Sequence, residues 1–173
     1  MPDRYQTVYA KHLGSAAAPT AGLHFTSELL TNIKSLGVSV VEVTLHVGVD
    51  TFRPVHVETP ENHGIHKEYW YLSDFTARTI NKAKLKGGRI ICGGTTTVRL
   101  LEHAASEAEG LPLTAGSGMA DLYILPGFSF KITDAMITNF HLPRSTLLML
   151  VSAFASREAI ISAYHDAIAK GYR

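Results

Sequence analysis

Hydrophobic and polar positions along the chain repeat with two different periods, which indicates both helices and strands. Apolar residues recur every three or four positions over 26–36, so this stretch predicts a helix that stops at Gly37. Apolar and polar residues alternate over 39–47, which predicts a strand. A second strand is predicted over 65–72, where aromatic residues are frequent.

Capping signals extend this pattern towards the C-terminus. Ser73, Ser145 and Ser156 each precede a helical stretch, and a serine hydroxyl can accept a hydrogen bond from an N–H group of the first turn. The elements predicted in this part of the chain are helices at 73–86, 146–155 and 156–170, a helix from the glycine pair to 108, strands at 89–92, 121–125 and 132–137, and a loop at 110–118.

The uneven order of helices and strands predicts an α/β fold with a mixed sheet rather than a purely parallel one. The 173 residues suit one α/β domain over 1–173 with a core of its own. No apolar run is long enough to cross a bilayer, and a single cysteine, Cys92, excludes an internal disulfide, so we expect a cytoplasmic protein. A net charge of +1 argues against a strongly basic nucleic-acid binder. The basic run at 82–89 is either a solvated helix end or a local phosphate contact.

The stretch 138–155, TNFHLPRSTLLMLVSAFA, joins a polar turn to an apolar helix. Pro143 and the residue before it favour an extended or turned backbone, so the helix begins only after Ser145. The polar turn would then lie at the positive end of a helix whose faces are mostly buried, where N–H groups lack partners. This arrangement suits a ligand-binding site, and a capped core helix is the alternative.

A second turn with similar properties joins a predicted strand to a helix at Gly93-Gly94-Thr95-Thr96-Thr97. A glycine turn before a helix is a geometry that binds anions, although the sequence fits neither GxGxxG nor a Walker A loop. Arg99 lies one helical turn further on and should lean back towards Thr95 and Thr96. The alternative is a surface arrangement of Arg99 with Glu102 or His103. We expect both helix starts to converge on a single pocket.

The candidate site residues favour chemistry without a metal. His63, His66 and Glu68 form the best possible metal cluster, but no HExxH or CxxC motif occurs, and no GxSxG motif indicates a hydrolase. Histidine can transfer protons near neutral pH, and arginine can hold a carboxylate. Together the polar residues suit a substrate with ribose and amino-acid parts, and the candidates are His24, His46, His66, Glu68, Thr95, Thr96, Arg99, Asn139, His141, Arg144 and Ser145.

Several long blocks resemble one enzyme family over nearly the whole chain. They are RYQTVYA at 4–10, AAPTAGLHFT at 17–26, TLHVGVDTFRPV at 44–55, GTTTVRLLE at 94–102, PGFSF at 126–130 and the stretch 138–155. On these blocks the chain resembles the S-adenosylmethionine:tRNA ribosyltransferase-isomerases of queuosine biosynthesis. The family's usual chain is about twice as long, and the resemblance is to its C-terminal half, without the inserted β-barrel domain. Asp50 stands where the family commonly has glycine.

The resemblance implies a mixed, partly barrel-like β-sheet flanked by helices, and an unusual reaction. The family transfers and isomerises the ribosyl moiety of S-adenosylmethionine onto 7-aminomethyl-7-deazaguanine at the tRNA wobble position. The product is epoxyqueuosine, and adenine and methionine are released. S-adenosylmethionine is a consumed substrate, so the resemblance implies no cofactor and no metal. The expected partners are this tRNA, S-adenosylmethionine and a partner chain that supplies the other half.

With this chemistry, the candidate residues take two kinds of role as hypotheses. Proton transfer and its support are assigned to His46, His66, Glu68 and His141. Arg99 with Thr95 and Thr96 would hold the methionine carboxylate, and Arg144 would meet tRNA phosphate. The remaining substrate-binding candidates are His24, Asn139 and Ser145. Two other readings stay open: a noncatalytic tRNA-binding or interaction module, and a generic nucleotide-binding α/β domain.

Overall fold

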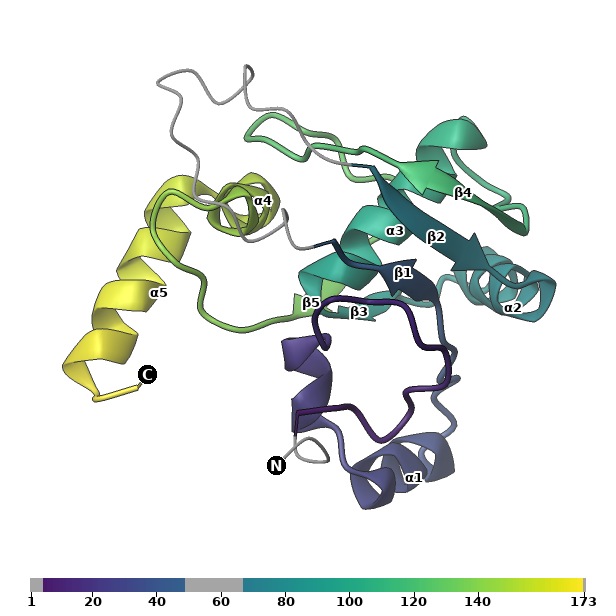
Figure 1. Cartoon of the computed structure of the whole chain (residues 1–173), viewed down its shortest axis with the longest axis horizontal. Coiled ribbons are helices and arrows are strands. Elements are labelled where there is room, and N and C mark those ends of the chain that lie inside the picture. The colour runs from purple at the N-terminus through teal and green to yellow at the C-terminus, as the bar shows by residue number, and fades with distance from the viewer. Residues whose placement is uncertain (1–4, 49–66, 173) are drawn as a thin grey trace.

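The computed structural model of the chain describes residues 5–48 and 67–172, and Figure 1 shows how its helices surround two small sheets. The fold is mixed α/β, as predicted. The predictions for Asp50, His63 and His66 concern residues outside the described ranges. Within the described residues the strands form two open sheets and no closed barrel, so the expected partly barrel-like sheet is not seen there.

The first sheet is antiparallel, with strand order β1-β2-β4. Its strands are β1 (Thr44–His46), β2 (Glu68–Leu72) and β4 (Gly116–Ala120). Alternate residues of the central strand are buried, namely Glu68, Trp70 and Leu72. Of the strand predicted over 39–47, only Thr44–His46 pairs with a neighbouring strand.

The position of β4 corrects two predictions, because the strand occupies part of the predicted loop and ends before the predicted strand at 121–125. Its glycines explain the difference. A Cβ atom on Gly116 would lie 3.1 Å from the Trp70 ring, and one on Gly118 would lie 3.4 Å from the Trp70 indole nitrogen. Glycine is disfavoured in strands in general, but here it makes room for a buried indole.

The second sheet is the parallel pair of β3 (Ile91–Gly93) and β5 (Ala135–Ile137). Both strands end at the same edge because they run in the same direction, with Gly93 paired to Ile137. The predicted mixed sheet is not seen among the described residues, because the antiparallel and parallel pairings occur in separate sheets.

Five α-helices of the described residues lie around these sheets. They are α1 (Ser27–Ser35), α2 (Asp74–Leu85), α3 (Thr95–Glu107), α4 (Thr146–Ala155) and α5 (Arg157–Ala169). Of these, α2, α3 and α4 contribute buried residues to one hydrophobic core. The predicted N-caps Ser73, Ser145 and Ser156 are confirmed, because each side chain accepts a hydrogen bond from the first turn of its helix. α3 lies centrally and contacts β1, β3, β4 and α4.

α4 is less buried than its apolar sequence predicts. Only Leu150 and Val151 are buried, and the other apolar residues of the helix are partly exposed. α4 and α5 lie together at one side of the molecule (Figure 1). No single helix among the described residues has the length and apolarity needed to span a membrane; α4 and α5 reach them only together, across a bend of 111°.

Candidate functional site

Two polar segments follow the carboxyl ends of the parallel strands. Gly94 and the start of α3 follow β3, and Thr138 follows β5. The two segments are joined directly, because the Gly94 N–H donates a hydrogen bond to the Ile137 carbonyl at 2.8 Å. Ligands of α/β proteins bind preferentially outside the carboxyl ends of parallel strands. This edge is therefore the natural place for a site.

A short 3-10 helix, η2 (Thr20–His24), completes the edge. His24 Nε2 lies 2.8 Å from Asn139 Oδ1, and the Asn139 amide donates to the Thr20 hydroxyl at 2.9 Å. The ring of Phe25 packs over Gly93, where a Cβ atom would come within 3.4 Å of it. Three segments that are distant in sequence thus meet at the edge, and two predicted site residues, His24 and Asn139, touch there.

The start of α3 has the form that the glycine turn predicts. Gly94, with a φ of 98°, is the N-cap, a conformation that residues with a Cβ rarely adopt. It has no side chain to cap the helix, so the first N–H groups receive no side-chain acceptor from it. Thr95 is buried, and Thr96 is partly exposed. The terminus can therefore favour a negatively charged group.

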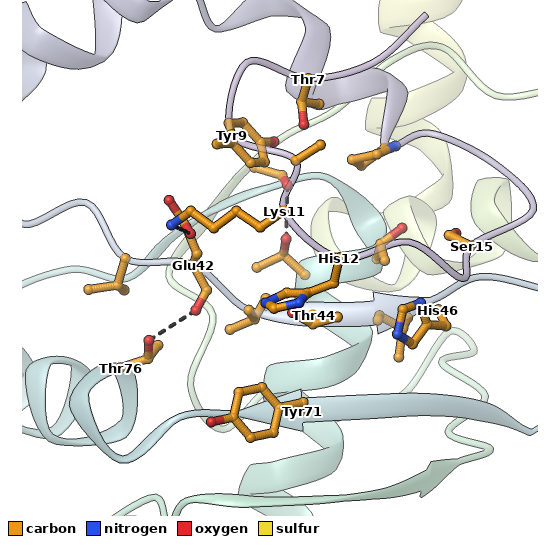
Figure 2. A pocket seen from close by; sticks show the side chains of 18 of the residues that line it. Thr7, Tyr9, Lys11, His12, Ser15, Glu42, Thr44, His46, Tyr71 and Thr76 are labelled. Atoms are coloured by element: carbon orange, nitrogen blue, oxygen red, sulfur yellow. Dashed lines mark hydrogen bonds and ion pairs between the residues drawn. The ribbon is translucent and has the colours of Figure 1, made fainter.

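A pocket of about 440 Å³ opens beside this edge, between the N-terminal segment and β1 (Figure 2). The residues at 6–19 form one wall, and the residues at 40–47 face them. Gly93, Thr96 and Thr97 belong to the lining, so the start of α3 reaches this pocket. Two of the predicted site residues, His46 and Thr96, line it.

The charges in the pocket balance each other. Lys11 Nζ lies 2.6 Å from the Glu42 carboxylate, and both side chains are well exposed, so the pair adds little stability. Burial raises the pKa of Tyr9, and the nearby Glu42 carboxylate raises it further. Tyr9 therefore stays a neutral hydrogen-bonding group at physiological pH.

His46 is held rigidly at the same pocket. Its ring stacks on Tyr69 with centroids 5.7 Å apart and an interplanar angle of 25°. A Cβ atom on Gly14 would approach the ring to 2.9 Å, so glycine is needed where the N-terminal segment crosses it. Its buried Nδ1 has no hydrogen-bond partner among the described residues.

Arg99 and Glu68 are paired inside the fold. Arg99 Nη1 donates to Glu68 Oε2 at 2.7 Å, both residues are buried, and Arg99 Nε donates to the Leu122 carbonyl at 3.4 Å. The Gly48 N–H donates to the other Glu68 oxygen at 3.3 Å. Arg99 thus lies away from the surface arrangement considered as the alternative. Its assignment to a substrate carboxylate stays a prediction, and in this structure its partner is Glu68.

Two neighbours of Arg99 on α3, Glu102 and His103, also make contacts within the fold. Glu102 is fully buried and accepts the N–H groups of Lys131, Ile132 and Thr133 at 2.8, 3.2 and 2.9 Å. His103 packs edge-on against Trp70. Arg99, Glu102 and His103 therefore stabilise the fold in this structure.

The expectation of one pocket for both helix starts is wrong for the pockets described here. Arg99 lines a crevice of about 10 Å³ together with Thr146 and other residues of α4. The start of α3 lines the larger pocket instead, and His141 lines neither. The reason is that Arg99 turns towards Glu68 rather than towards Thr96.

His141 lies in the polar turn before α4. The ring nitrogen Nε2 of His141 is 3.0 Å from the Thr138 hydroxyl, and the backbone N–H of His141 donates to the Tyr164 hydroxyl at 2.7 Å. Burial lowers the pKa of His141, because water no longer stabilises the charged ring. The ring is therefore neutral at physiological pH and able to accept a proton.

The two residues before α4 differ in exposure and bonding. Arg144 is exposed and has a φ of 55°. The Ser145 hydroxyl donates to the Leu142 carbonyl at 2.7 Å and accepts from the Leu148 N–H at 3.1 Å. Ser145 is thus fully engaged as a cap, whereas Arg144 is free to extend into solvent.

The family model described as queuosine biosynthesis protein matches residues 1–173. The chain belongs to this family. A similar solved structure is the S-adenosylmethionine tRNA ribosyltransferase of Thermotoga maritima, which is 40% identical with a TM-score of 0.67. The match covers 87% of this chain and 46% of that one, so this chain spans about half the length of its relative.

Membership of the queuosine biosynthesis family confirms the resemblance found in the sequence.

Some residues that line the pocket were not among the site residues predicted from the sequence. Thr7, Tyr9 and Lys11 line the pocket but have no periodic pattern around them. The only indication in the sequence was the family-like block at 4–10, to which no chemical role was assigned. The candidate metal ligands His63 and His66 lie outside the described residues, and the described residues hold no group of three potential ligands.

Proposed function

We propose that this chain carries out, or contributes half of, the ribosyl transfer of queuosine biosynthesis. The ribosyl moiety of S-adenosylmethionine is transferred to 7-aminomethyl-7-deazaguanine in tRNA and isomerised, giving epoxyqueuosine with release of adenine and methionine. A base removes a proton next to the sulfonium, a proton donor assists the departure of adenine, and the aminomethyl group attacks.

One observation carries the proposal: the chain matches the family model over residues 1–173, and its family-like segments lie at one edge of the parallel sheet. The segments at 17–26 and 138–155 meet there through the His24–Asn139 contact, and Gly94 of the segment at 94–102 binds Ile137, the residue just before 138. The relative's name, S-adenosylmethionine tRNA ribosyltransferase, supports the reaction class.

The roles follow the geometry where it is described. His141 has a lowered pKa and His46 lines the pocket, so these two are the proposed proton-transfer groups. His66 keeps its proposed acid or base role from the sequence. Glu68 is a positioning residue, because its oxygens bind Arg99 and the Gly48 N–H below β1. Asn139 is proposed to orient the ribose together with His24.

The proposal is tested by incubating the chain with S-adenosylmethionine and tRNA that carries 7-aminomethyl-7-deazaguanine. Release of free adenine and conversion of the base to epoxyqueuosine, measured by chromatography and mass spectrometry, are expected. His141→Gln should lower the rate by roughly 100-fold or more, the usual contribution of a general acid or base. His165→Gln, an exposed site on α5, is the matched control. A wild-type rate in His141→Gln would remove that assignment.

A second candidate function is a noncatalytic tRNA-binding or interaction module, and the chain's coverage of 46% of its relative favours it. The assay is therefore run with and without a polypeptide that corresponds to the remaining half of the relative. Adenine release only in the mixture would assign the chain a partner. Binding of tRNA that weakens with salt, without adenine release in either arm, would assign the module function.

A further inference from the structure

The parallel pair of β3 and β5 has one face in the core and one face exposed. Cys92 and Met136 are paired in register and pack into the hydrophobic core. Side chains alternate along a strand, so the residues on either side of these two point the other way. Ile91 and Ile137 lie on this second face and are 52% and 42% exposed. We call it the outer face, and it is formed by Ile91, Ala135, Ile137 and the ring of Phe25, which packs over Gly93.

An exposed apolar face is unusual for parallel strands. Parallel sheets occur almost only where both faces are covered, and their strands are accordingly apolar on both sides. The inner face has such a cover, because β3 contacts α3. On the outer face, the helices and strands of the described residues leave Ile91 and Ile137 about half exposed. One side of the parallel pair therefore lacks the cover that such strands need.

The helix that follows Phe25 is also poorly packed. α1 buries none of its residues, and Leu29 on this helix is 41% exposed. In Figure 1 it lies at the periphery of the molecule. A helix of nine residues is marginal alone and normally owes its stability to the packing of an apolar face. Incomplete packing thus continues along the chain from the outer face into α1.

The solved relative contains residues that can supply the missing cover. The match covers 46% of the relative's chain, so more than half of that chain has no counterpart here. A second copy of this chain fits less well, because a stable dimer buries about 800 Å² per partner and two half-exposed isoleucines offer only a small part of such an area. A longer polypeptide can cover the outer face together with other exposed apolar residues.

We infer that the outer face is the docking surface for an apolar segment from the part of the relative that this chain does not match. The source of the segment rests on the proposed function, in which this chain contributes half of the reaction, whereas the surface rests on the exposure of a parallel pair. Ile137 directly precedes the TNFH turn, and its carbonyl accepts the Gly94 N–H. Docking on Ile137 therefore also holds the candidate site in place.

The test co-expresses the 173-residue chain with the unmatched part of the Thermotoga maritima relative as a separate polypeptide. The complex is isolated by affinity purification, and its dissociation constant is measured by analytical ultracentrifugation. Ile91→Lys and Ile137→Lys should each weaken the complex roughly tenfold or more, because docking would bury a lysine charge in an apolar contact. Ile168→Lys changes the same residue type at a site on α5 that is 70% exposed, and this matched control should bind like the wild type.

A thiol on the outer face reports the same contact without introducing a charge. Cys92 is the only cysteine of the chain and is buried, so an added thiol can be labelled selectively. The thiol of Ile137→Cys should react readily in the free chain and roughly tenfold or more slowly in the complex. Ile168→Cys should react at the same rate in both. This measurement decides the matter even where a lysine variant fails to fold.

Several results would overturn the assignment. They are the absence of a complex with the wild-type chain, equal weakening by Ile168→Lys, and an Ile137→Cys thiol that stays equally reactive in the complex. Self-association of the chain that Ile91→Lys abolishes would also overturn it, because the occupant would then be a second copy.

The two proposals fail differently. A complex that depends on Ile91 and Ile137, without adenine release in any arm of the tRNA assay, would retain the docking surface and remove the reaction. Adenine release in an arm of that assay, with the Ile137→Cys thiol unprotected, would retain the reaction and remove the docking surface.

Discussion

The guanidinium of Arg99 lies 2.7 Å from the carboxylate of Glu68, and the fold buries both. Separating two buried charges costs free energy because neither is then solvated by water, so the pair holds α3 against β2. Arg99→Met removes one buried hydrogen-bonded charge from the Glu68 carboxylate and should lower the free energy of unfolding by about 3–5 kcal/mol in urea denaturation. Lys170→Met breaks the exposed Lys170–Asp166 pair and should cost about 0.5 kcal/mol or less. Equal effects of the two substitutions would contradict the buried position of Arg99.

Gly22 lies where the N-terminal segment crosses η2. A Cβ atom there would collide with the Tyr9 hydroxyl and approach Thr7 Cγ2 to 2.7 Å. Gly22→Ala should therefore displace this wall of the pocket and destabilise the chain by about 1–3 kcal/mol, measured by denaturant unfolding. Gly48→Ala is the control, because a Cβ atom at Gly48 would meet no atom of the described residues within 4 Å. If both variants are equally stable, the segment does not rest on η2 in solution.

His141 makes stability depend on acid. Burial lowers its pKa in the folded chain below the ordinary value of 6.5, so the unfolded chain binds a proton first as the pH falls. The folded state therefore loses stability below about pH 6.5. His141→Gln should show a smaller drop in unfolding temperature between pH 7.5 and 5.5 than the wild type. His165→Gln, exposed on α5, should keep the wild-type drop. An unchanged profile in His141→Gln would place its ring in water.

Cys92 is shielded from thiol reagents. It is 1% exposed, and burial raises the pKa of its thiol to about 12, with a smaller opposing effect from the Thr133 hydroxyl. Because the thiolate is the reactive form, labelling by a disulfide reagent at pH 8 should be roughly 100-fold or more slower in the folded chain than in urea. Ser162→Cys adds an exposed thiol to α5 and should react at once. Rapid labelling of both thiols would show that the core opens easily.

The helices could be predicted well because their ends depend on neighbouring residues. Ser73, Ser145 and Ser156 cap helices that the sequence alone placed correctly. Strands were harder, since pairing joins residues that are far apart in sequence. β4 was missed because its glycines matter only through Trp70, which is 46 to 48 positions away in the chain.

The candidate site was predicted in part. The glycine turn, η2 and the TNFH segment meet at one edge, and two predicted site residues, His24 and Asn139, contact each other there. The direction of the Arg99 side chain could not be predicted, because its partner Glu68 is 31 positions away in sequence and comes near it only when β2 takes its place in the sheet. The pocket wall at 6–19 also escaped, because irregular segments have no periodicity from which their neighbours can be inferred.

The Glu102 carboxylate accepts hydrogen bonds from three successive backbone N–H groups and so joins α3 to the segment that leads into β5. The glycine turn lies at the start of α3, and the TNFH turn follows β5. These hydrogen bonds therefore require the glycine turn and the TNFH turn to move together. Adjustment to a bound ligand would then fall on η2 and the N-terminal wall of the pocket, which the Glu102 carboxylate does not contact.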